Sequence, residues 1–561
     1  MFFCRPTYII LTKMNPSSSI FRRTLVLATG ICLLAAAYAQ AKNKRPAASE
    51  QQLFIGEGIA EAATQYGPVR GFLLHGIYSF RGIPYGDDTG GKNRFMPPQP
   101  PRAWQEIRPA VAFGASSPQP FYDRRPESYS MFVDHWNYDL MDEDCLRLNI
   151  WTPGIADGKR RPVLVWLHGG GFTQGNGIEQ DSYDGENIAR YGDIVFCSVN
   201  HRLGALGFSD LAGAGGEKYR HSGNAGMLDI VAALKWIQDN VANFGGDPSN
   251  VTIMGQSGGG SKVCLLCAMP AAKGLFHKAV ALSGNSVKAN NSGYAQRLGN
   301  AILREAGLDA SQVDSLQSVP WEQYLELANR AQQRMAAEDP GSRSGFAPVA
   351  DGIDIPKGTF FEGENRTTGS DVPMLLCSTF HEWNPDRDNP ELESISFEQV
   401  IERLTPRYGA RTAKIVRTYA EAFPDCRPIE IWAMIASNRQ GIVRTANAKC
   451  NQQSPVYMAW FGWESPLFNG RHRAFHCIDI GFWLLNTDRM ITHTGGGSAT
   501  RKLSRKMADA LLQFMRTGDP NCRALPRWPR YTPQRGELII LDSKCRTAED
   551  PDRTARNAFN D

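Results

Sequence analysis

Short apolar runs alternate with longer amphipathic stretches between Val163 and Glu382, and this alternation constrains the fold more than any other feature. Four of the runs are almost continuously apolar, as strands buried on both faces must be. These runs are residues 163–167, 194–199, 251–254 and 372–376. Between the second and third runs, apolar residues recur at helical spacing from Met227 to Val241, and Gly245-Gly246 supplies a glycine stop. Strand, helix and strand in this order predict an α/β chain with a mostly parallel central sheet and helices on both faces.

The C-terminal half extends this pattern. Residues 457–461 and 538–541 are expected to form the last strands, with a helix from about Lys502 to Arg516 between them. Residues 296–337 and 397–440 have a helical pattern and no obvious strand partners. We expect them to be helical insertions over the carboxyl ends of the strands, where open α/β sheets bind ligands.

The first 39 residues differ in kind from the rest. Arg22-Arg23 precedes a mostly apolar run from Leu25 to Ala37, and Ala37-Tyr38-Ala39 offers the small residues of a cleavage site. We predict a signal peptide over residues 1–39, with Met14 as an alternative start, and a secreted or periplasmic protein that begins near Gln40. The apolar run is shorter than the roughly 20 residues of a membrane helix, and no later stretch approaches that length.

Composition argues against several other functions. The formal net charge of the 561-residue chain is +4, and its short basic groups lack interleaved aromatic residues, so nucleic-acid binding is not expected. No paired CxxC motif or HExxH stretch suggests a metal site, and nothing in the sequence calls for a cofactor.

The cysteines that follow the predicted signal peptide lack the spacing of a disulfide-dense scaffold. Cys197 and Cys377 lie in apolar runs and are expected to be buried thiols. Cys264 and Cys267 have the spacing of a redox motif, but they lie inside a predicted helix, away from the helix start that would lower a thiol pKa. We therefore interpret this pair as packing residues.

One serine stands in the context of a nucleophile. Gly255-Gln256-Ser257-Gly258-Gly259 follows the predicted strand 251–254 and leads into a helical stretch that ends before Pro270. A serine on a strained strand-to-helix turn is exposed for attack, and the flanking glycines let the backbone pass without clash. We therefore predict that Ser257 is a catalytic nucleophile; the alternative is an ordinary glycine-rich turn.

A serine nucleophile also needs donors for the oxyanion of its tetrahedral intermediate. The segment His168-Gly169-Gly170-Gly171-Phe172 follows the predicted strand 163–167 and is a glycine loop whose amides can point at such a charge. The amides of Gly170 and Gly171, with that of Gly258, are the expected oxyanion hole. His168 and Phe172 are expected to shape the loop rather than to react. The alternative to an oxyanion hole is that the glycine segment is simply a flexible loop.

With these motifs the chain resembles the type-B carboxylesterase and cholinesterase family of the α/β-hydrolase fold over nearly all of its mature length. Further matching motifs are Phe80-Arg81-Gly82-Ile83-Pro84-Tyr85, Arg94-Phe95, Glu143-Asp144-Cys145-Leu146-Arg147-Leu148-Asn149, Asn200-His201-Arg202-Leu203-Gly204, Gly223-Asn224-Ala225-Gly226-Met227-Leu228-Asp229, Phe244-Gly245-Gly246-Asp247-Pro248 and Arg516-Thr517-Gly518-Asp519-Pro520. The elbow with Gln256 and Gly258 is similar to that of bacterial members. The resemblance implies a single α/β-hydrolase catalytic domain over residues 40–561.

The resemblance also implies the other two members of a Ser-His-Glu triad, which in this fold follow the serine in the order acid, then histidine. Glu382, in the turn after the run 372–376, matches the family's glutamate, and His476 matches its histidine. His476 would accept the proton of Ser257, return it to the leaving alcohol and then activate water. Glu382 would orient the imidazole and stabilise its charged form.

Neighbouring residues keep alternatives open at these positions. His472, four residues before His476, is the rival base, and an ordinary surface glutamate is the alternative for Glu382. Nearby Asp386 is expected to be a surface charge. Ser283, in Ala281-Leu282-Ser283-Gly284, matches a serine that lies near the triad in the family and supports it.

The resemblance does not extend to the family disulfides. The residue that corresponds to Cys145 usually pairs with an upstream cysteine just before Pro-Gln, but here Ser117 occupies that position. Cys145 is therefore expected to lack this partner. The second family disulfide, shortly after the elbow helix, lacks clear counterparts as well.

Together these features predict an exported serine esterase that hydrolyses small-molecule carboxylic esters through an acyl-enzyme. Two alternatives stay open: a catalytically inactive binding or adhesion relative of the same fold, and an amide or thioester hydrolase with the same constellation. Ester hydrolysis is favoured because all triad and oxyanion residues can be assigned, and because an alkoxide leaves more easily than an amine.

Overall fold

The runs expected to be strands lie in one large mixed sheet. The computed structural model describes residues 51–120, 130–133, 140–338, 345–437 and 439–560. From Ile55 onward the strand order is β4 (Phe72–Leu74), β5 (Ile77–Pro84), β7 (Arg147–Thr152), β9 (Val195–Val199), β8 (Arg161–Leu167), β10 (Gly246–Gln256), β11 (Lys278–Leu282), β14 (Met374–Thr379), β15 (Val456–Phe461), β16 (Glu537–Leu541) and β17 (Arg546–Glu549). All neighbours from β9 to β16 are parallel. The strands outside this range pair antiparallel, so the predicted α/β class with a mostly parallel sheet is confirmed.

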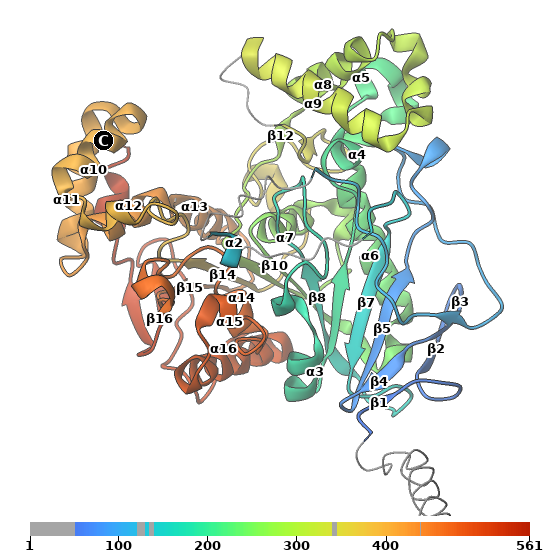
Figure 1. Cartoon of the computed structure of the whole chain (residues 1–561), viewed down its shortest axis with the longest axis horizontal. Coiled ribbons are helices and arrows are strands. Elements are labelled where there is room, and N and C mark those ends of the chain that lie inside the picture. Colours follow the sequence, from blue (N-terminus) through green and yellow to red (C-terminus); the bar gives the residue numbers. More distant parts are fainter. Residues whose placement is uncertain (1–50, 121–129, 134–139, 339–344, 438, 561) are drawn as a thin grey trace, which may run out of the picture. The chain divides into compact units, whose positions relative to one another are not determined.

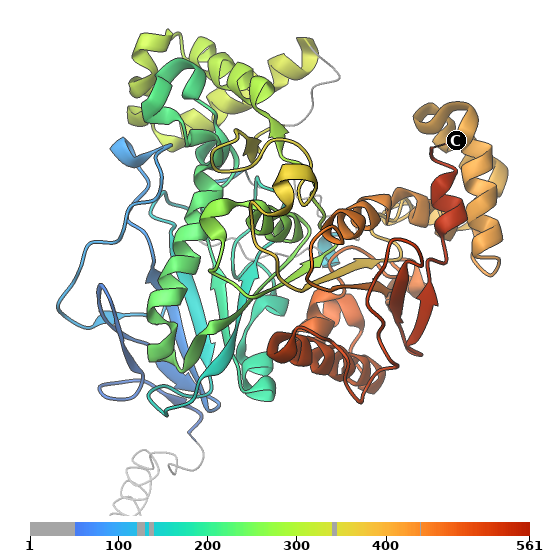
Figure 2. The ribbon, with the colours of Figure 1, turned by 180° about the vertical axis from the view of Figure 1, so that it is seen from behind.

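The central strands β9, β14, β15 and β16 are buried along their whole length, which explains why they are mostly apolar. Along β8, Val163 and Val165 belong to the same hydrophobic core as residues of α6 (Ala225–Asn240). Leu164 and Trp166, which point to the opposite face, belong to a second core with residues of α16 (Ser498–Thr517). Figures 1 and 2 show these helices on the two sides of the sheet.

Two predicted elements have boundaries that differ from the observed ones. Strand β10 starts at Gly246, well before the predicted Val251, because Gly246 pairs with Arg161 across a register shift. The helical stretch 296–337 is broken into α8 (Ser292–Glu305) and α9 (Trp321–Glu338), with a short 3-10 helix at Ala310–Ser318 between them.

The two predicted insertions are helical and lie in different places. Helices α8 and α9 lie beyond the end of the sheet at which α4 (Gly204–Phe208) and α7 (Gly258–Ala268) are found (Figures 1 and 2). The second stretch forms α10 (Phe397–Tyr408), α11 (Thr412–Ala422), α12 (Pro428–Ala436) and α13 (Arg439–Lys449). Helices α10 and α11 pack beside α17 (Arg553–Asn557) at the C-terminal side of the molecule, a pairing that the sequence did not predict.

The remaining elements are short. They are β1 (Leu53–Phe54), a small sheet of β2 (Glu61–Thr64), β3 (Gly67–Arg70) and β6 (Arg108–Pro109), the pair β12 (Asn290–Asn291) and β13 (Val349–Ala350), and the helices α2 (Ser130–Val133), α3 (Glu186–Gly192), α5 (Ala212–Gly215), α14 (Ile480–Trp483) and α15 (Ile491–Thr494).

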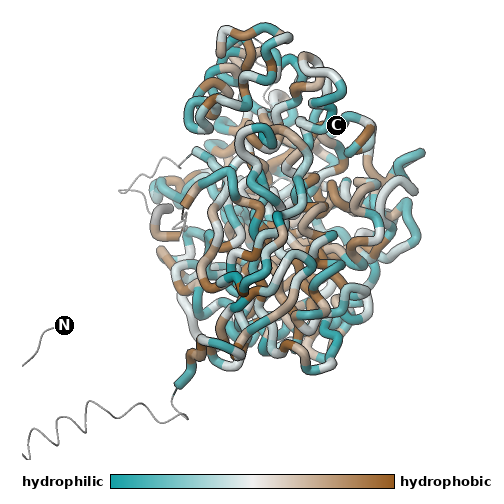
Figure 3. Tube along the Cα trace, turned by 90° about the vertical axis from the view of Figure 1, so that its right-hand side faces the viewer, coloured by the Kyte–Doolittle hydropathy of each residue, from teal (hydrophilic) through white to brown (hydrophobic). Residues whose placement is uncertain are grey.

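Residues Ile55–Asp561 form one compact unit. Apolar and polar residues alternate along its outer helices (Figure 3). Among the described residues, no helix combines the length and the apolar character needed to cross a bilayer. The predicted signal peptide, residues 1–39, lies outside the described residues.

Candidate active site

Ser257 lies on a sharp turn between β10 and α7. Its backbone has φ 57° and ψ −122°, in a region that costs a non-glycine residue about 1–3 kcal/mol. The turn is tight because α7 starts against β8: a Cβ at Gly259 would lie 2.0 Å from the Leu167 carbonyl oxygen. Only glycine fits there, so the glycines of the motif permit the strained serine conformation.

The glycine loop after β8 packs against this turn. Gly170 and Gly171 have φ of 77° and 63°, conformations that favour glycine. A Cβ at Gly258 would lie 2.0 Å from the Gly171 carbonyl oxygen, so the first turn of α7 and the loop are in backbone contact. The three residues predicted as oxyanion donors are therefore neighbours, beside the positive end of α7 and next to Ser257.

His476 and Glu382 contact each other, although they lie far apart in the sequence. The Nδ1 atom of His476 is 2.5 Å from Oε2 of Glu382. The other carboxylate oxygen of Glu382 accepts a 2.7 Å hydrogen bond from the backbone N–H of Thr379, and the His476 N–H donates to the Glu382 carbonyl at 3.2 Å. Glu382 is thus a buried, fully engaged carboxylate and not a surface residue.

The electrostatic setting of His476 favours its charged form. Burial alone would lower the pKa of His476, but the neighbouring Cys477 and the Glu382 carboxylate outweigh burial and raise this pKa well above the ordinary value. Because the carboxylate contacts Nδ1, Nε2 is the ring nitrogen left for other hydrogen bonds.

The imidazole of His476 contacts Gln256, the residue that precedes Ser257, whose amide nitrogen lies near both ring nitrogens. The side-chain Nε2 of Gln256 lies 3.2 Å from His476 Nε2, and the Gln256 Oε1 accepts a 3.3 Å hydrogen bond from the Cys477 thiol. Sequence reasoning treated Gln256 only as a variant of the elbow motif and missed these contacts. They place the imidazole beside the elbow.

Trp383 is a second neighbour that the sequence did not single out. Its ring stacks on the imidazole of His476, with centroids 4.5 Å apart and planes inclined by 27°. The residue is nevertheless 57% exposed, an unusual state for tryptophan. Its position directly after Glu382 was the only available signal, and that position alone does not fix where the side chain points.

Ser283 lies at the end of β11, behind the elbow. Its φ is 47°, and its backbone N–H donates to the Cys377 carbonyl at 2.7 Å. The next residue, Gly284, packs so closely that a Cβ would lie 1.9 Å from the Ser257 carbonyl oxygen. Within the described residues the Ser283 hydroxyl is buried and has no hydrogen-bond partner.

Asp479 is a further buried carboxyl that the sequence did not indicate. It lies three residues after His476, is fully buried and accepts a hydrogen bond from Trp483 Nε1 at 3.2 Å. Burial and, next, the charge of Glu382 raise the pKa of Asp479 to about 7.

The rival base His472 lies in a different environment. Its imidazole stacks on Phe468, with ring centroids 4.6 Å apart, and it is fully buried. Burial, together with Arg387, lowers the pKa of His472 to about 4, so the ring is neutral at physiological pH.

Asp386 is not the surface charge that we expected. It is 0% exposed, and both of its carboxylate oxygens accept hydrogen bonds of 3.1 Å from Nη1 of the equally buried Arg473. The expectation was wrong because an acidic residue in a polar segment gives no sign of a distant arginine. Removing one partner of a buried ion pair is strongly destabilising, so Asp386 is unsuitable as a silent control.

The predictions for the cysteines are confirmed. Cys197 and Cys377 are buried thiols in strands, and Cys264 and Cys267 are buried along α7 without a bond between them. Burial raises the pKa of Cys264 to about 11 and that of Cys267 to about 12, which is the opposite of a reactive thiol.

Cys145 is free and buried, as expected from the absence of its partner. At the position of the missing cysteine, the hydroxyl of Ser117 accepts a 3.1 Å hydrogen bond from the Leu203 N–H.

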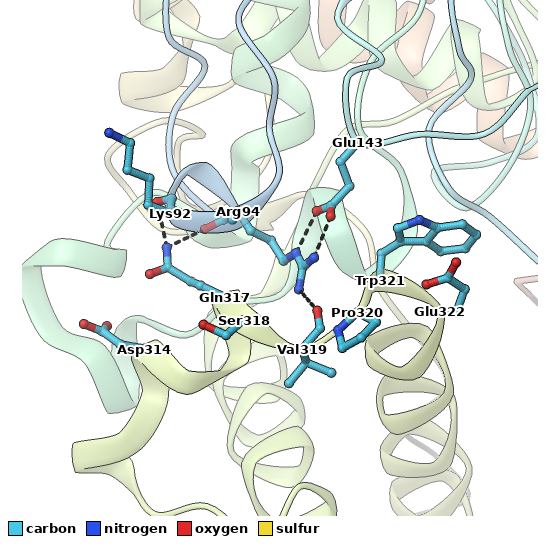
Figure 4. A pocket seen from close by; sticks show the side chains of 11 residues that line it. Lys92, Arg94, Glu143, Asp314, Gln317, Ser318, Val319, Pro320, Trp321 and Glu322 are labelled. Carbon is cyan, nitrogen blue, oxygen red and sulfur yellow. Dashed lines mark hydrogen bonds and ion pairs between the residues drawn. The ribbon is translucent and has the colours of Figure 1, made fainter.

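A pocket lined by residues of α9 and of the loops around Arg94 offers no competing chemistry (Figure 4). The Arg94 guanidinium binds both carboxylate oxygens of Glu143 and donates to the carbonyl oxygens of Leu316 and Val319. Its charge is already paired, and no serine–histidine pair lines this pocket. Elsewhere in the described residues, no cluster of three or more His, Cys, Asp or Glu side chains is arranged to hold a metal ion.

Several known proteins are similar to this chain over most of its length. The para-nitrobenzyl esterase of Bacillus subtilis is 33% identical over 508 residues, which span 88% of this chain and 97% of that protein. The phenmedipham hydrolase of Pseudarthrobacter oxydans is 33% identical over 504 residues, spanning 87% and 96%.

Two solved structures are similar in fold as well. An esterase from Clostridium hathewayi, described as able to hydrolyse aliphatic aromatic polyesters, superposes with a TM-score of 0.76 at 32% identity and covers 91% of this chain and 99% of its own. A carboxylesterase of Geobacillus stearothermophilus gives a TM-score of 0.73 at 33% identity, covering 89% and 100%. The profile of the carboxylesterase family matches residues 60–559. The chain therefore belongs to the carboxylesterase family and is a carboxylic ester hydrolase of the type-B class.

Proposed function

We propose that the protein hydrolyses carboxylic esters through an acyl-enzyme on Ser257, with His476 as general base and Glu382 as the acid that orients it. The observation that carries this proposal is the contact of the Glu382–His476 pair with Gln256, the residue directly before Ser257. A base that is held by a buried carboxylate and lies beside a strained serine is the arrangement that activates a hydroxyl.

In the acylation step, Ser257 Oγ attacks the ester carbonyl carbon and its proton passes to His476 Nε2. The carbonyl oxygen becomes an oxyanion, for which the amides of Gly170, Gly171 and Gly258 are the proposed donors. Collapse of this intermediate breaks the bond to the alcohol oxygen, which takes the proton from His476 and leaves. Ser257 then carries the acyl group.

Deacylation repeats the sequence with water. His476 Nε2 removes a proton from water, the hydroxide attacks the acyl carbon, and the second oxyanion forms in the same place. Its collapse releases the carboxylic acid, while Ser257 regains its proton from His476. In both steps the Gln256 side-chain amide moves away from His476 Nε2, so that the reacting oxygen can take its place. Catalytic hydrogen bonds often reach their final geometry only when the substrate binds.

Labelling with a fluorophosphonate distinguishes this function from a binding or adhesion role, since only an activated serine reacts. We expect stoichiometric labelling at Ser257 and turnover of simple aryl esters, with far slower hydrolysis of matched amides and thioesters. A folded protein that is not labelled would favour the binding role. Faster hydrolysis of the amide than of the matched ester would favour the amide hydrolase.

Substituting Glu382 by glutamine should reduce turnover by about 10⁴-fold with little change in substrate binding, because the amide keeps the shape but not the charge. The carboxylate raises the pKa of His476, and the base acts only when neutral. The acid limb of the kcat/KM profile should therefore lie above pH 6.5 in the wild type and move to lower pH in Glu382→Gln.

Glu391→Gln is the matched control for this measurement, because Glu391 is an exposed carboxylate in the same segment. It should leave both turnover and the pH profile unchanged. Turnover of Glu382→Gln within a few-fold of the wild type, at equal Tm, would show that another residue is the acid.

We also propose that the protein is exported, on the basis of Arg22-Arg23, the apolar run Leu25 to Ala37 and the small residues before Gln40. N-terminal sequencing of the protein recovered outside the cytoplasm should give a chain that starts near Gln40. Recovery of the uncleaved chain in the cytoplasm alone would contradict export.

A further inference from the structure

Lys262 is a buried cation directly behind the oxyanion loop. It lies in α7, in the second helical turn after Ser257, and it is 0% exposed. Its Nζ donates a 3.0 Å hydrogen bond to the carbonyl oxygen of His168, the residue that leads from β8 into Gly169-Gly170-Gly171. The side chain thus ties the elbow helix to the start of the loop.

The groups around Lys262 neutralise its charge only in part. The imidazoles of His168 and His201 stack on each other with centroids 5.0 Å apart, and burial together with Lys262 keeps both pKa values well below the ordinary range. The Phe172 ring centroid lies 6.0 Å from Nζ. Glu179 is the acidic neighbour, and its own Oε1 accepts a 3.0 Å hydrogen bond from the Tyr183 hydroxyl.

A fully buried ammonium of this kind is unfavourable, because its desolvation costs more free energy than one carbonyl contact returns. Burial accordingly lowers the pKa of Lys262 to about 7, against the opposing effect of Glu179. Such a cation is useful where negative charge develops in a site of low dielectric, since a fixed charge there needs no reorganisation during the reaction.

We propose that Lys262 is a positioning residue of the ester-hydrolysing site: its ammonium holds the His168 carbonyl and places a positive charge behind the loop that receives the oxyanion. This inference rests on the proposed acyl-enzyme function. Lys262 does not touch the substrate. It acts by fixing the loop and by stabilising the negative charge of the tetrahedral intermediate relative to the neutral ester.

Lys262→Met, which keeps the length of the side chain without its charge, should lower kcat by about 10- to 100-fold and leave KM within about threefold. Binding of a trifluoromethyl ketone, which forms an oxyanion on the active-site serine, should weaken by the same factor as kcat/KM. Binding of a neutral substrate analogue that lacks an electrophilic carbonyl should not change, because it forms no oxyanion. Lys262→Arg, which keeps the charge, should recover most of the loss.

The pH profile separates an electrostatic role from a merely structural one. Because the charged form of Lys262 is the active one, turnover should decline as Lys262 loses its proton at rising pH. This alkaline limb should disappear in Lys262→Arg, whose guanidinium stays charged. Glu179→Gln removes the neighbouring charge that favours the ammonium, so it should shift the alkaline limb to lower pH. The double variant Glu179→Gln/Lys262→Arg should show no such shift.

Each outcome decides between the alternatives. Wild-type kcat and trifluoromethyl ketone affinity in a folded Lys262→Met would overturn the proposal, as would an unchanged alkaline limb in Lys262→Arg. If Lys262→Met does not fold, the Lys262→Arg and Glu179→Gln profiles still decide. A wild-type protein without fluorophosphonate labelling or ester turnover would instead refute the proposed function itself.

Discussion

Replacement of Ser257 by alanine should abolish ester turnover, with a loss of about 10⁶-fold in kcat, because the proposed base and acid cannot act without the proposed nucleophile. The variant should fold normally, since alanine adopts the same strained backbone as serine at φ 57°. The measurement is turnover of an aryl ester by purified protein, together with fluorophosphonate labelling, which should be lost.

Ser257→Gly serves as the companion variant. Glycine adopts this backbone conformation without strain, so we expect it to be as inactive as alanine while its free energy of unfolding rises by about 1 kcal/mol. Near wild-type turnover by either variant would show that Ser257 is not the nucleophile. Loss of stability on Ser257→Gly would show that the turn is not strained.

His476→Ala should reduce kcat by a similar factor, about 10⁵- to 10⁶-fold, because the hydroxyl of Ser257 then has no base to take its proton. His472→Ala is the control. It opens a cavity beside Phe468 and should lower the Tm, but its turnover per folded molecule should stay within about threefold of the wild type. The opposite ranking, at matched folded fractions, would assign the base to His472.

Ser257 and the glycine loop could be predicted because their signals are local. A nucleophile elbow is a strand, a turn and a helix in direct succession, so glycines at fixed offsets and the flanking apolar runs describe it completely. The same holds for Gly170 and Gly171 after β8. Their left-handed conformations follow from residue type and the demands of a tight turn.

Glu382 and His476 carry no such local signal, and their assignment depended on resemblance. They are 94 residues apart, and they meet because β14 and β15 are parallel neighbours whose carboxyl ends lie at the same edge of the sheet. The burial of Asp386 against Arg473, which we did not expect, has the same origin. An ion pair across 87 residues leaves no pattern in either segment.

The sequence by itself determined the α/β class, the succession of the central strands along the chain, the place of Ser257 between a strand and a helix, and the family. These features depend on backbone periodicity, short glycine motifs and their succession. Tertiary structure alone decided which side chains surround the reacting groups: Gln256 and Trp383 against His476, and Lys262 beneath the His168 carbonyl. The physical reason is that backbone conformation responds to residues a few positions away. Contacts between side chains depend instead on how the strands cross and pack, which brings together segments that are distant in the chain.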